Sequence, residues 1–147
     1  MSREIKFRAF VKPILRFANR QVGFMIDVSE IDFNEKYVAN DDGTVYYFDE
    51  IELVQYAGLK DKNGNEVHEG DIDQAENGDK SVIVFLLKAG TYCVMPMDIY
   101  LNNDYQNEAF FPDFIYGFGY DLFFDNCTPE KYLNIIGNIY EHNHLLG

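Results

Sequence analysis

The sequence predicts a single-domain, mainly β protein with several hairpins and one or two short helices. Three observations support this class: short segments in which apolar and polar residues alternate, turn signals between these segments, and an aromatic content of 16% in 147 residues. Alternation with a period of two is typical of strands that are buried on one face. A hydrophobic content of 47% is sufficient for a packed core, and we expect residues 1–147 to form one domain.

The first half of the chain contains most of the alternating segments. Two of them, expected to pair as a hairpin, place apolar residues at every second position: Ile5, Phe7, Ala9 and Val11, then Val22, Phe24, Ile26 and Val28. A turn cluster at residues 40–43 precedes residues 44–48, which are all β-branched or aromatic and therefore predict a strand. Residues 51–56 predict another short strand.

The second half continues with a further hairpin and a short helix. Residues 82–87 and 91–95 are strand-like and are separated by a short turn containing Gly90. Thr128 and Pro129 are suited to the N-cap and first position of a helix, which is expected to end near residue 133. Residues 135–140 predict a closing strand.

The centre of the chain contains two turn signals close together. Asn63-Gly64 predicts a hairpin, because both residues tolerate the positive φ of tight primed turns. Gly70-Asp71 predicts a second sharp bend, in which glycine has a backbone conformation closed to other residues and the carboxylate accepts backbone N–H bonds. Ile72 is the first inward residue after it. This order of turn, Gly-Asp and strand is similar to that of small SH3-like barrels, so the expected fold is such a barrel with additional strands.

Three blocks of the sequence occur in the same order as in a known family: residues 3–10, residues 55–72 and residues 136–146. These blocks resemble those of the YopX-like family of phage and prophage proteins. Phe10 stands where that family usually has Trp, and residues 142–144 depart from its usual Asn-Pro-Glu. The positions that match its structural signature are Gly58, Leu59, Asp61, Asn63, Gly64, Gly70, Asp71, Ile72, Gly137 and Asn138. The resemblance implies a small β-rich protein from phage or prophage DNA and implies no established biochemical activity.

The net charge of −13 is distributed unevenly. Residues 1–20 carry six basic side chains and one acidic side chain, whereas the remaining residues carry six basic and 24 acidic side chains. An acidic surface repels nucleic acid, so the composition disfavours DNA or RNA as a partner. The basic N-terminal segment could lie against an acidic body, either its own or a neighbour's, or it could be an ordinary solvated strand face.

No catalytic constellation is visible in the sequence. It contains no nucleophile elbow, phosphate-binding glycine loop or Cys-His pairing, so we expect no enzyme activity, no catalytic residues and no cofactor. His142 and His144 are two residues apart, with Glu141 and His68 as further possible metal ligands. A structural metal site needs three or four convergent ligands, and only these two histidines are close in sequence, so no metal is expected.

The cysteines and the apolar runs indicate the compartment. Cys93 is expected to be a small buried hydrophobic residue, and no disulfide with Cys127 is expected. The longest apolar run, residues 82–87, is far shorter than the ~20 residues of a membrane helix. Basic residues interrupt the N-terminus where a secretory signal would be apolar. These features predict a cytoplasmic location and no membrane association, and the resemblance implies that the cell is a bacterial host.

Residues 105–125 contain nine aromatic residues and no lysine or arginine. Proteins that stack on single-stranded nucleic acid combine rings with basic side chains, so base stacking is disfavoured. The rings either fill the core or form a protein interface. The interface candidates are Phe110, Phe111, Phe114, Tyr116, Phe118 and Tyr120.

The sequence therefore predicts a non-enzymatic protein that binds a host or phage protein, or assembles with itself as a homo-oligomer. One alternative is an acidic decoy that mimics DNA and occupies a host nuclease or repressor. A second alternative is an enzyme of an unrecognised type.

Overall fold

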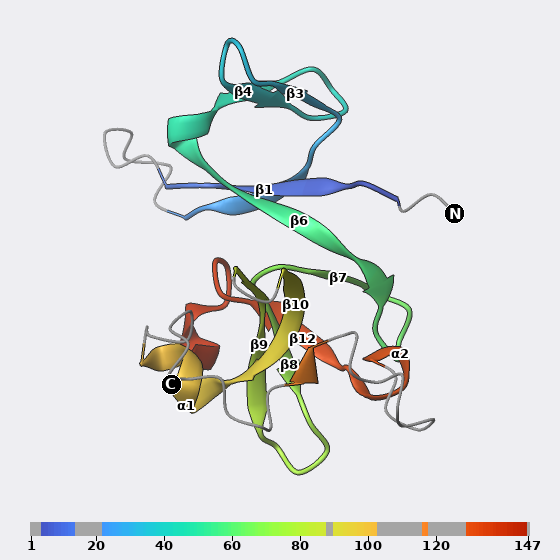
Figure 1. Ribbon diagram of the computed structural model, residues 1–147. Coiled ribbons are helices and arrows are strands. Elements are labelled where there is room, and N and C mark those ends of the chain that lie inside the picture. The colour runs from blue at the N-terminus through green and yellow to red at the C-terminus, as the bar shows by residue number, and fades with distance from the viewer. Residues whose placement is uncertain (1–3, 14–21, 88–89, 103–115, 118–128, 147) are drawn as a thin grey trace. The chain divides into compact units, whose positions relative to one another are not determined.

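The computed structural model describes residues 4–13, 22–87, 90–102, 116–117 and 129–146. The chain divides into two compact units, Met1–Tyr56 (unit 1) and Ala57–Gly147 (unit 2), which are described separately. The fold is mainly β, as predicted, and the interpretation as an SH3-like barrel stays a prediction. Figure 1 shows the elements: β1 Phe7–Val11, β2 Phe24–Asp27, β3 Glu30–Asp32, β4 Tyr37–Ala39, β5 Val45–Tyr47, β6 Ile51–Lys60, β7 Glu66–His68, β8 Asp71–Gln74, β9 Lys80–Leu86, β10 Thr91–Pro96, β11 Tyr116–Gly117, β12 Ile135–Asn138, helices α1 Met97–Leu101 and α2 Pro129–Tyr132, and 3-10 helices η1 Phe48–Glu50 and η4 Asn143–Leu146.

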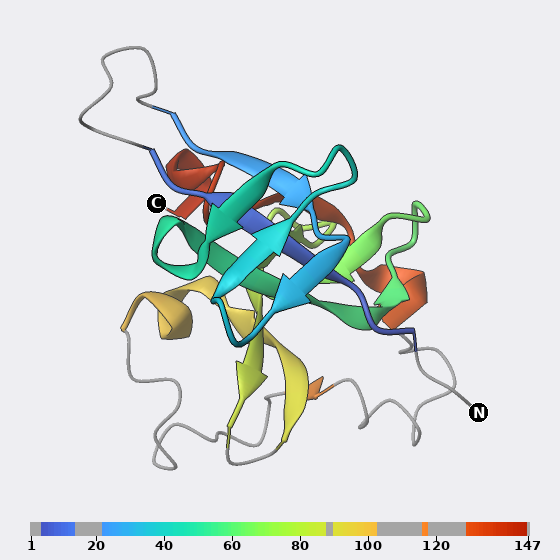
Figure 2. The same ribbon diagram turned by 90° about the horizontal axis from the view of Figure 1, so that it is seen from above.

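Unit 1 contains the hairpin predicted from the first alternating segments. Strand β1 pairs antiparallel with β2 on one side and with the first half of β6 on the other. A separate antiparallel sheet has the order β3-β4-β5 (Figure 2). The core of unit 1 consists of buried residues from both sheets: Ala9, Val11, Val38 and Ile51. Ile5, expected to point inward, is 70% exposed, because β1 begins only at Phe7.

The basic side chains of the N-terminal segment lie beside acidic side chains of their own unit. Arg8 Nε is 3.4 Å from Asp27 Oδ1, and Lys12 Nζ is 3.4 Å from Glu52 Oε1. These pairs are largely exposed, so each contributes about 0–1 kcal/mol to stability. Their position supports one alternative from the sequence, in which the basic segment lies against its own acidic body.

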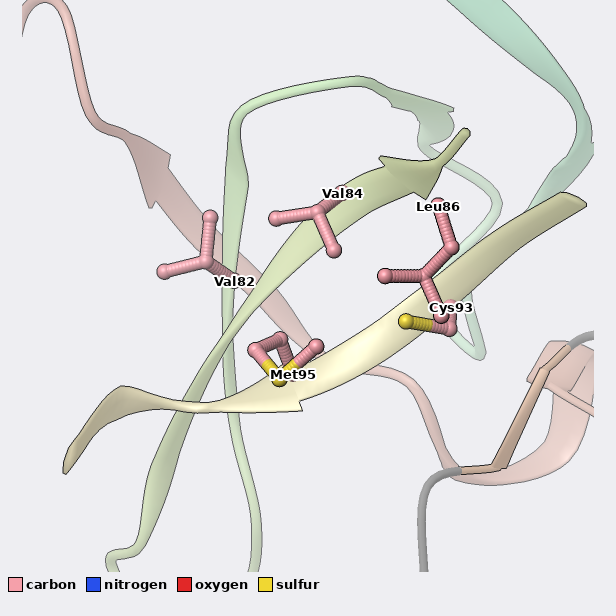
Figure 3. Close-up of a cluster of buried hydrophobic side chains, with 5 residues drawn as sticks. All are labelled: Val82, Val84, Leu86, Cys93 and Met95. Atoms are coloured by element: carbon pink, nitrogen blue, oxygen red, sulfur yellow. The ribbon is translucent and has the colours of Figure 1, made fainter. Parts of the chain in front are cut away.

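Unit 2 is built around the hairpin of β9 and β10. Its five-stranded antiparallel sheet has the order β11-β10-β9-β8-β12. One face carries a buried cluster, shown in Figure 3: Val82, Val84, Leu86, Cys93 and Met95. Alternate residues pack into a second cluster that includes Val67, Ile83, Tyr92 and Leu133. Strand β9 is therefore buried on both faces, which explains its nearly continuous apolar sequence.

The helical elements agree partly with the sequence prediction. Helix α2, Pro129–Tyr132, lies where the proline signal predicted it. Helix α1, Met97–Leu101, was not predicted, and its N-cap position is Pro96, which provides no side-chain cap. No helix in the described parts of the chain is both long and apolar enough to cross a membrane.

Three loops share one turn geometry, at residues 40–44, 61–65 and 75–79. In each loop, the first residue donates its N–H to the carbonyl oxygen of the fifth residue. The glycine at the fourth position donates its N–H to the carbonyl oxygen of the first residue. The glycine has a φ of +84 to +94° in all three. This is the geometry of a three-residue hairpin loop that closes with glycine in the left-handed region.

Candidate functional site

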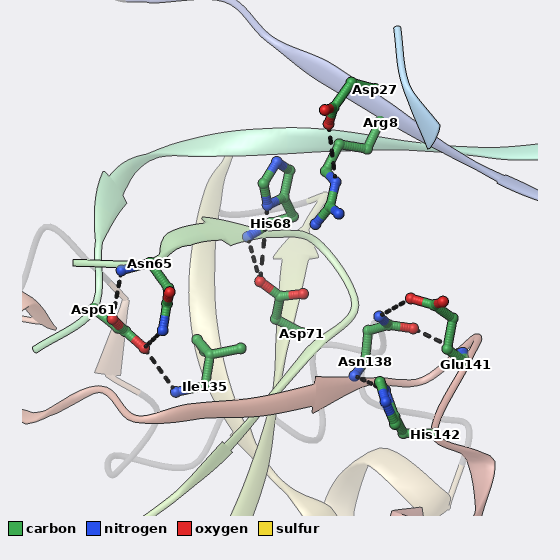
Figure 4. A network of polar contacts seen from close by, with 10 residues as sticks. All are labelled: Arg8, Asp27, Asp61, Asn65, His68, Asp71, Ile135, Asn138, Glu141 and His142. Carbon is green, nitrogen blue, oxygen red and sulfur yellow. Dashed lines mark hydrogen bonds and ion pairs between the residues drawn. The ribbon is translucent and has the colours of Figure 1, made fainter. Parts of the chain in front are cut away.

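Asp61 is the most extensively bonded residue of the signature. Its Oδ1 atom accepts the backbone N–H groups of Asn63 and Asn65, both at 2.9 Å. Its Oδ2 atom accepts that of Ile135 at 3.0 Å, and Figure 4 shows the bonds from Asn65 and Ile135. Burial raises the pKa of this carboxyl, but the hydrogen bonds from Ile135, Asn65 and Asn63 together outweigh burial and hold the pKa below its ordinary value. The carboxylate thus joins the hairpin loop to the start of β12.

The loop that Asp61 organises differs from the predicted one. A hairpin forms at Asn63-Gly64, as predicted, but only Gly64 has a positive φ, at +85°. The prediction of a primed two-residue turn is therefore wrong. The physical reason is the side chain of Asp61, which accepts the backbone N–H groups of Asn63 and Asn65 and thereby favours a three-residue loop.

Gly70 has the backbone conformation predicted for it, with a φ of +87°. Its N–H donates to the carbonyl oxygen of Ile83 at 2.8 Å, and its carbonyl oxygen accepts the N–H of Ile139 at 2.9 Å. A Cβ atom at this position would lie 2.8 Å from Cε2 of Tyr140. Gly70 is therefore required both by its φ and by the close approach of a ring.

The residues after Gly70 also behave as predicted. Asp71 Oδ2 accepts the backbone N–H of His68 at 2.7 Å, which confirms that this carboxylate fixes the bend. The His68 imidazole is buried, with Nδ1 3.9 Å from the same oxygen. Ile72 is fully buried in β8, between Gly137 of β12 and Val82 of β9.

Asn138 organises the reversal at the end of β12. Its Oδ1 atom accepts the N–H groups of Tyr140 and Glu141 at 3.0 and 2.8 Å, and its Nδ2 atom donates to Glu141 Oε1 at 3.0 Å. Its own N–H donates to His142 Nδ1 at 3.1 Å. A Cβ atom on Gly137 would lie 2.7 Å from that imidazole nitrogen. These bonds end the strand at Asn138, so the prediction of a strand to residue 140 is too long.

The remaining signature positions are Gly58 and Leu59 in β6. Gly58 has a φ of +91° inside the strand, and Leu59 packs beside the cluster that contains Val67 and Leu133. Every signature position is thus engaged in a turn, a strand or the core of unit 2. None of these engagements is by itself a catalytic arrangement.

The metal ligands considered in the sequence do not form a cluster in the described parts of the chain. There, no three His, Cys, Asp or Glu residues are placed to hold one ion. His142 Nδ1 accepts a hydrogen bond, and its ring contacts that of His144 edge-on at 6.0 Å. Cys93 is fully buried in the sheet, where burial raises the pKa of its thiol to about 12, so its prediction as a buried hydrophobic residue is confirmed.

A small cavity of about 100 Å³ lies beside the Gly70 bend in unit 2. Its wall includes Glu69, Val82, Tyr100 and Tyr140. Burial raises the pKa of the Glu69 carboxyl. The volume suits a few water molecules or one small group, and the described residues that line it include one carboxyl and no histidine, cysteine or serine.

The six aromatic interface candidates lie almost entirely outside the described residues. Only the backbone of Tyr116 is described, where it pairs with Val94 of β10 as the start of β11. Their role in an interface therefore stays a prediction.

Unit 1 presents a feature that the sequence analysis did not identify. The register of β3, β4 and β5 places six side chains on one face, called here the outer face: Glu30, Asp32, Tyr37, Ala39, Val45 and Tyr47. The intervening residues Ile31, Val38 and Tyr46 pack with the core. Val45 is 43% exposed and Tyr47 is 53% exposed. The alternation around Tyr46 was a signal for this arrangement, but β3 and β4 are too short to have been predicted.

A family model described as YopX protein matches residues 6–147, which include parts of both units. No curated protein matches the chain.

Proposed function

We propose that this chain, which belongs to the YopX protein family, is a non-enzymatic protein that acts by binding other proteins. The observation that carries this proposal is the outer face of the β3-β4-β5 sheet, where Val45 and Tyr47 are exposed side by side on one strand. Phe33, in the loop after β3, is 72% exposed. Exposed aromatic and aliphatic side chains gathered on one element are typical of interaction surfaces.

The bonding of the signature residues supports a role outside catalysis. Asp61, Asp71 and Asn138 use their side-chain oxygens to accept backbone N–H groups. A catalytic carboxylate would instead direct an oxygen toward a substrate within hydrogen-bond reach. The residues that define the family therefore support the architecture of unit 2, and we propose that the chain needs no catalytic residue and no cofactor.

Self-assembly is part of the proposed activity. We propose that the aromatic residues of 105–125 contribute to a homo-oligomer, and that the other partner is a protein of the phage or of its bacterial host, bound in the cytoplasm. The ion pairs of Arg8 and Lys12 within unit 1 reduce the contribution that this basic strand could make to contacts with a neighbour.

An acidic decoy that mimics DNA is the second candidate, and the concentration of carboxylates in residues 27–50 favours it. That segment has eight acidic residues and one basic residue, Lys36. A DNA mimic needs carboxylates spaced like phosphates, whereas the outer face has carboxylates on β3 only and tyrosine, alanine and valine on β4 and β5. The mixture of apolar and acidic groups supports a protein epitope more directly than it supports mimicry of a phosphate backbone.

Affinity capture from host lysate, followed by quantitative mass spectrometry, tests the proposed function. The bait is the full chain, and the control bait is an unrelated β protein of similar size and net charge. We expect one or a few proteins, or the chain itself, to be retained at near-stoichiometric amounts by this chain alone. Equal recovery on both baits, together with a monomeric mass in light scattering, would overturn the proposal. Retention that duplex DNA abolishes would favour the decoy.

A further inference from the structure

We propose that the outer face of the β3-β4-β5 sheet binds a basic segment of another protein, one that carries lysine or arginine together with an apolar or aromatic side chain. This inference rests on the proposed function and specifies its site and the chemistry of the partner.

The apolar part of the outer face is preformed. Val45 and Tyr47 alternate with Tyr46, which packs with the core of unit 1, so the strand has a fixed orientation. Tyr47 pairs across the sheet with Tyr37, and the two rings meet edge-on with centroids 6.3 Å apart. Two tyrosines and a valine on a supported strand can anchor a partner without first becoming ordered.

The acidic part of the same face lies on β3, which pairs with β4 on the side opposite β5. Glu30 and Asp32 pair with Ala39 and Tyr37 of β4, which places both residues on the outer face. Asp32 Oδ1 also accepts the backbone N–H groups of Asn34 and Glu35, so Glu30 is the carboxylate of this pair that is available to a partner.

The Tyr37 hydroxyl donates to Glu30 Oε1 at 3.4 Å. The carboxylates of Glu30 and Asp32 on the face of Tyr37 give this part of the sheet a negative field. In agreement with it, the negative charge of Glu30, with burial and the charge of Asp32, raises the pKa of the Tyr37 phenol. Such a field attracts a cationic side chain and disfavours an acidic one.

The surrounding segment adds to this field. Residues 27–50 contain the carboxylates Asp27, Glu30, Asp32, Glu35, Asp41, Asp42, Asp49 and Glu50. Within the described parts of the chain, only Asp27 of this set forms an ion pair with a basic side chain, that of Arg8. The other seven carboxylates outnumber Lys36, the one basic residue of the segment, so the segment that carries the outer face has a net negative charge. A partner with both basic and apolar side chains would complement both the negative charge and the exposed apolar groups of this face.

A different protein fits this face better than a second copy of the chain. The basic residues of the described N-terminal segment already lie beside carboxylates of their own unit, as Lys6 does with Glu4, Arg8 with Asp27 and Lys12 with Glu52. For a second copy to bind here, its N-terminal basic side chains would have to break these ion pairs. A different protein with its own lysine or arginine side chains could form new ion pairs with the outer face. Nucleic acid is disfavoured by the charge of the face itself.

Selection from a displayed library of random 12-residue peptides on the immobilised full-length protein tests the inference. We expect the enriched peptides to combine lysine or arginine with an aromatic or large aliphatic residue. Labelled copies of these peptides are then titrated in solution by fluorescence anisotropy. Enriched peptides that lack basic residues, or the absence of any enriched peptide, would overturn the inference.

Matched variants locate the binding site on the outer face. Val45→Thr and Tyr47→Ser should each weaken binding of the enriched peptide by about tenfold. Val22→Thr is the control for the loss of an exposed valine, because Val22 is 80% exposed and precedes β2. It should leave binding unchanged. Since Val45→Thr keeps a β-branched residue in the strand, it tests the face even if Tyr47→Ser is poorly folded.

A second pair of variants tests the charge. Glu30→Lys should weaken binding by about tenfold, and Glu76→Lys, in an exposed loop of unit 2, should not. The assignment of the face would be overturned if Val45→Thr and Val22→Thr changed peptide affinity equally, or if Glu30→Lys and Glu76→Lys did so. If capture from lysate and self-assembly persist while these variants bind normally, the inference fails and the proposed function stands.

Discussion

Substitution of Gly70 tests whether the family signature is architectural. The structure gives two separate costs for a side chain at this position. A φ of +87° places any L-residue in the left-handed half of the map, and a Cβ atom would also lie 2.8 Å from Cε2 of Tyr140. Gly64 is a natural control, because its φ is +85° and a Cβ atom there has no heavy atom within 4 Å. Comparison of the two positions separates backbone strain from the contact with the ring.

The expected magnitudes follow from these geometries. Gly64→Ala should lower the free energy of unfolding by about 1 kcal/mol, which is the cost of a non-glycine residue at positive φ. Gly70→Ala should cost about 2 kcal/mol, since the Tyr140 ring must also move. Gly70→Val, with a branched Cβ, should cost on the order of 3 kcal/mol. For a chain of this length, that corresponds to a decrease in Tm of about 6–12 °C.

Urea denaturation at 25 °C, supported by thermal melts, measures these differences. The order of stability should be parent, Gly64→Ala, Gly70→Ala and Gly70→Val. A Gly70→Val variant as stable as the parent would refute the reasoning altogether. Equal effects of Gly64→Ala and Gly70→Ala would refute the part that concerns the tyrosine ring.

Three further predictions concern the polar network, the tail and the assembly. Asp61→Asn should cost about 1–2 kcal/mol at pH 7, since the bonds to a charged acceptor are stronger than those to an amide. The folded-state pKa of Asp61 is lowered, so its stabilisation is present above about pH 4 and disappears as the pH falls through the folded pKa. Urea titrations between pH 7 and pH 2 should therefore show the difference in the free energy of unfolding between parent and variant becoming smaller. A difference that stays constant would contradict the assignment. Protein purified without a tag should contain less than one equivalent of zinc, nickel or iron, and chelator should not change its Tm; one equivalent of zinc that a His142→Ala/His144→Ala variant loses would show that the tail is a metal site. Multi-angle light scattering should give a multiple of 17.1 kDa, reduced by Phe111→Asp or Phe118→Asp, whereas a monomeric parent would indicate that these rings belong to the core.

Sequence patterns were most informative where one face of a strand is buried and the segment is long. The three predicted hairpins are present, and residues 82–87 lie mostly in β9, which is buried on both faces. Strands β3 and β4 have only three residues each, which is too short for a period of two to be recognised. Helix α1 has Pro96 at its N-cap and no side-chain cap, so it has no sequence signal of the usual kind.

The signature residues were identified from the sequence, but their partners were not. The prediction that Asp71 accepts a backbone N–H is confirmed, because this bond spans only three residues. The bond from Ile135 to Asp61 spans 74 residues and depends on tertiary structure. His142 was considered as a metal ligand, yet its Nδ1 atom accepts the N–H of Asn138. The outer face was missed because it requires the register of three short strands.

The two roles proposed for the chain, architecture in the signature and binding on the outer face, can be tested in one measurement. Hydrogen–deuterium exchange of the full chain, with and without an enriched basic peptide or a captured partner, reports which backbone segments the ligand protects. We predict protection within residues 30–47, and no change within residues 57–72 and 135–146. Protection centred on those two signature segments, with residues 30–47 unchanged, would contradict the account.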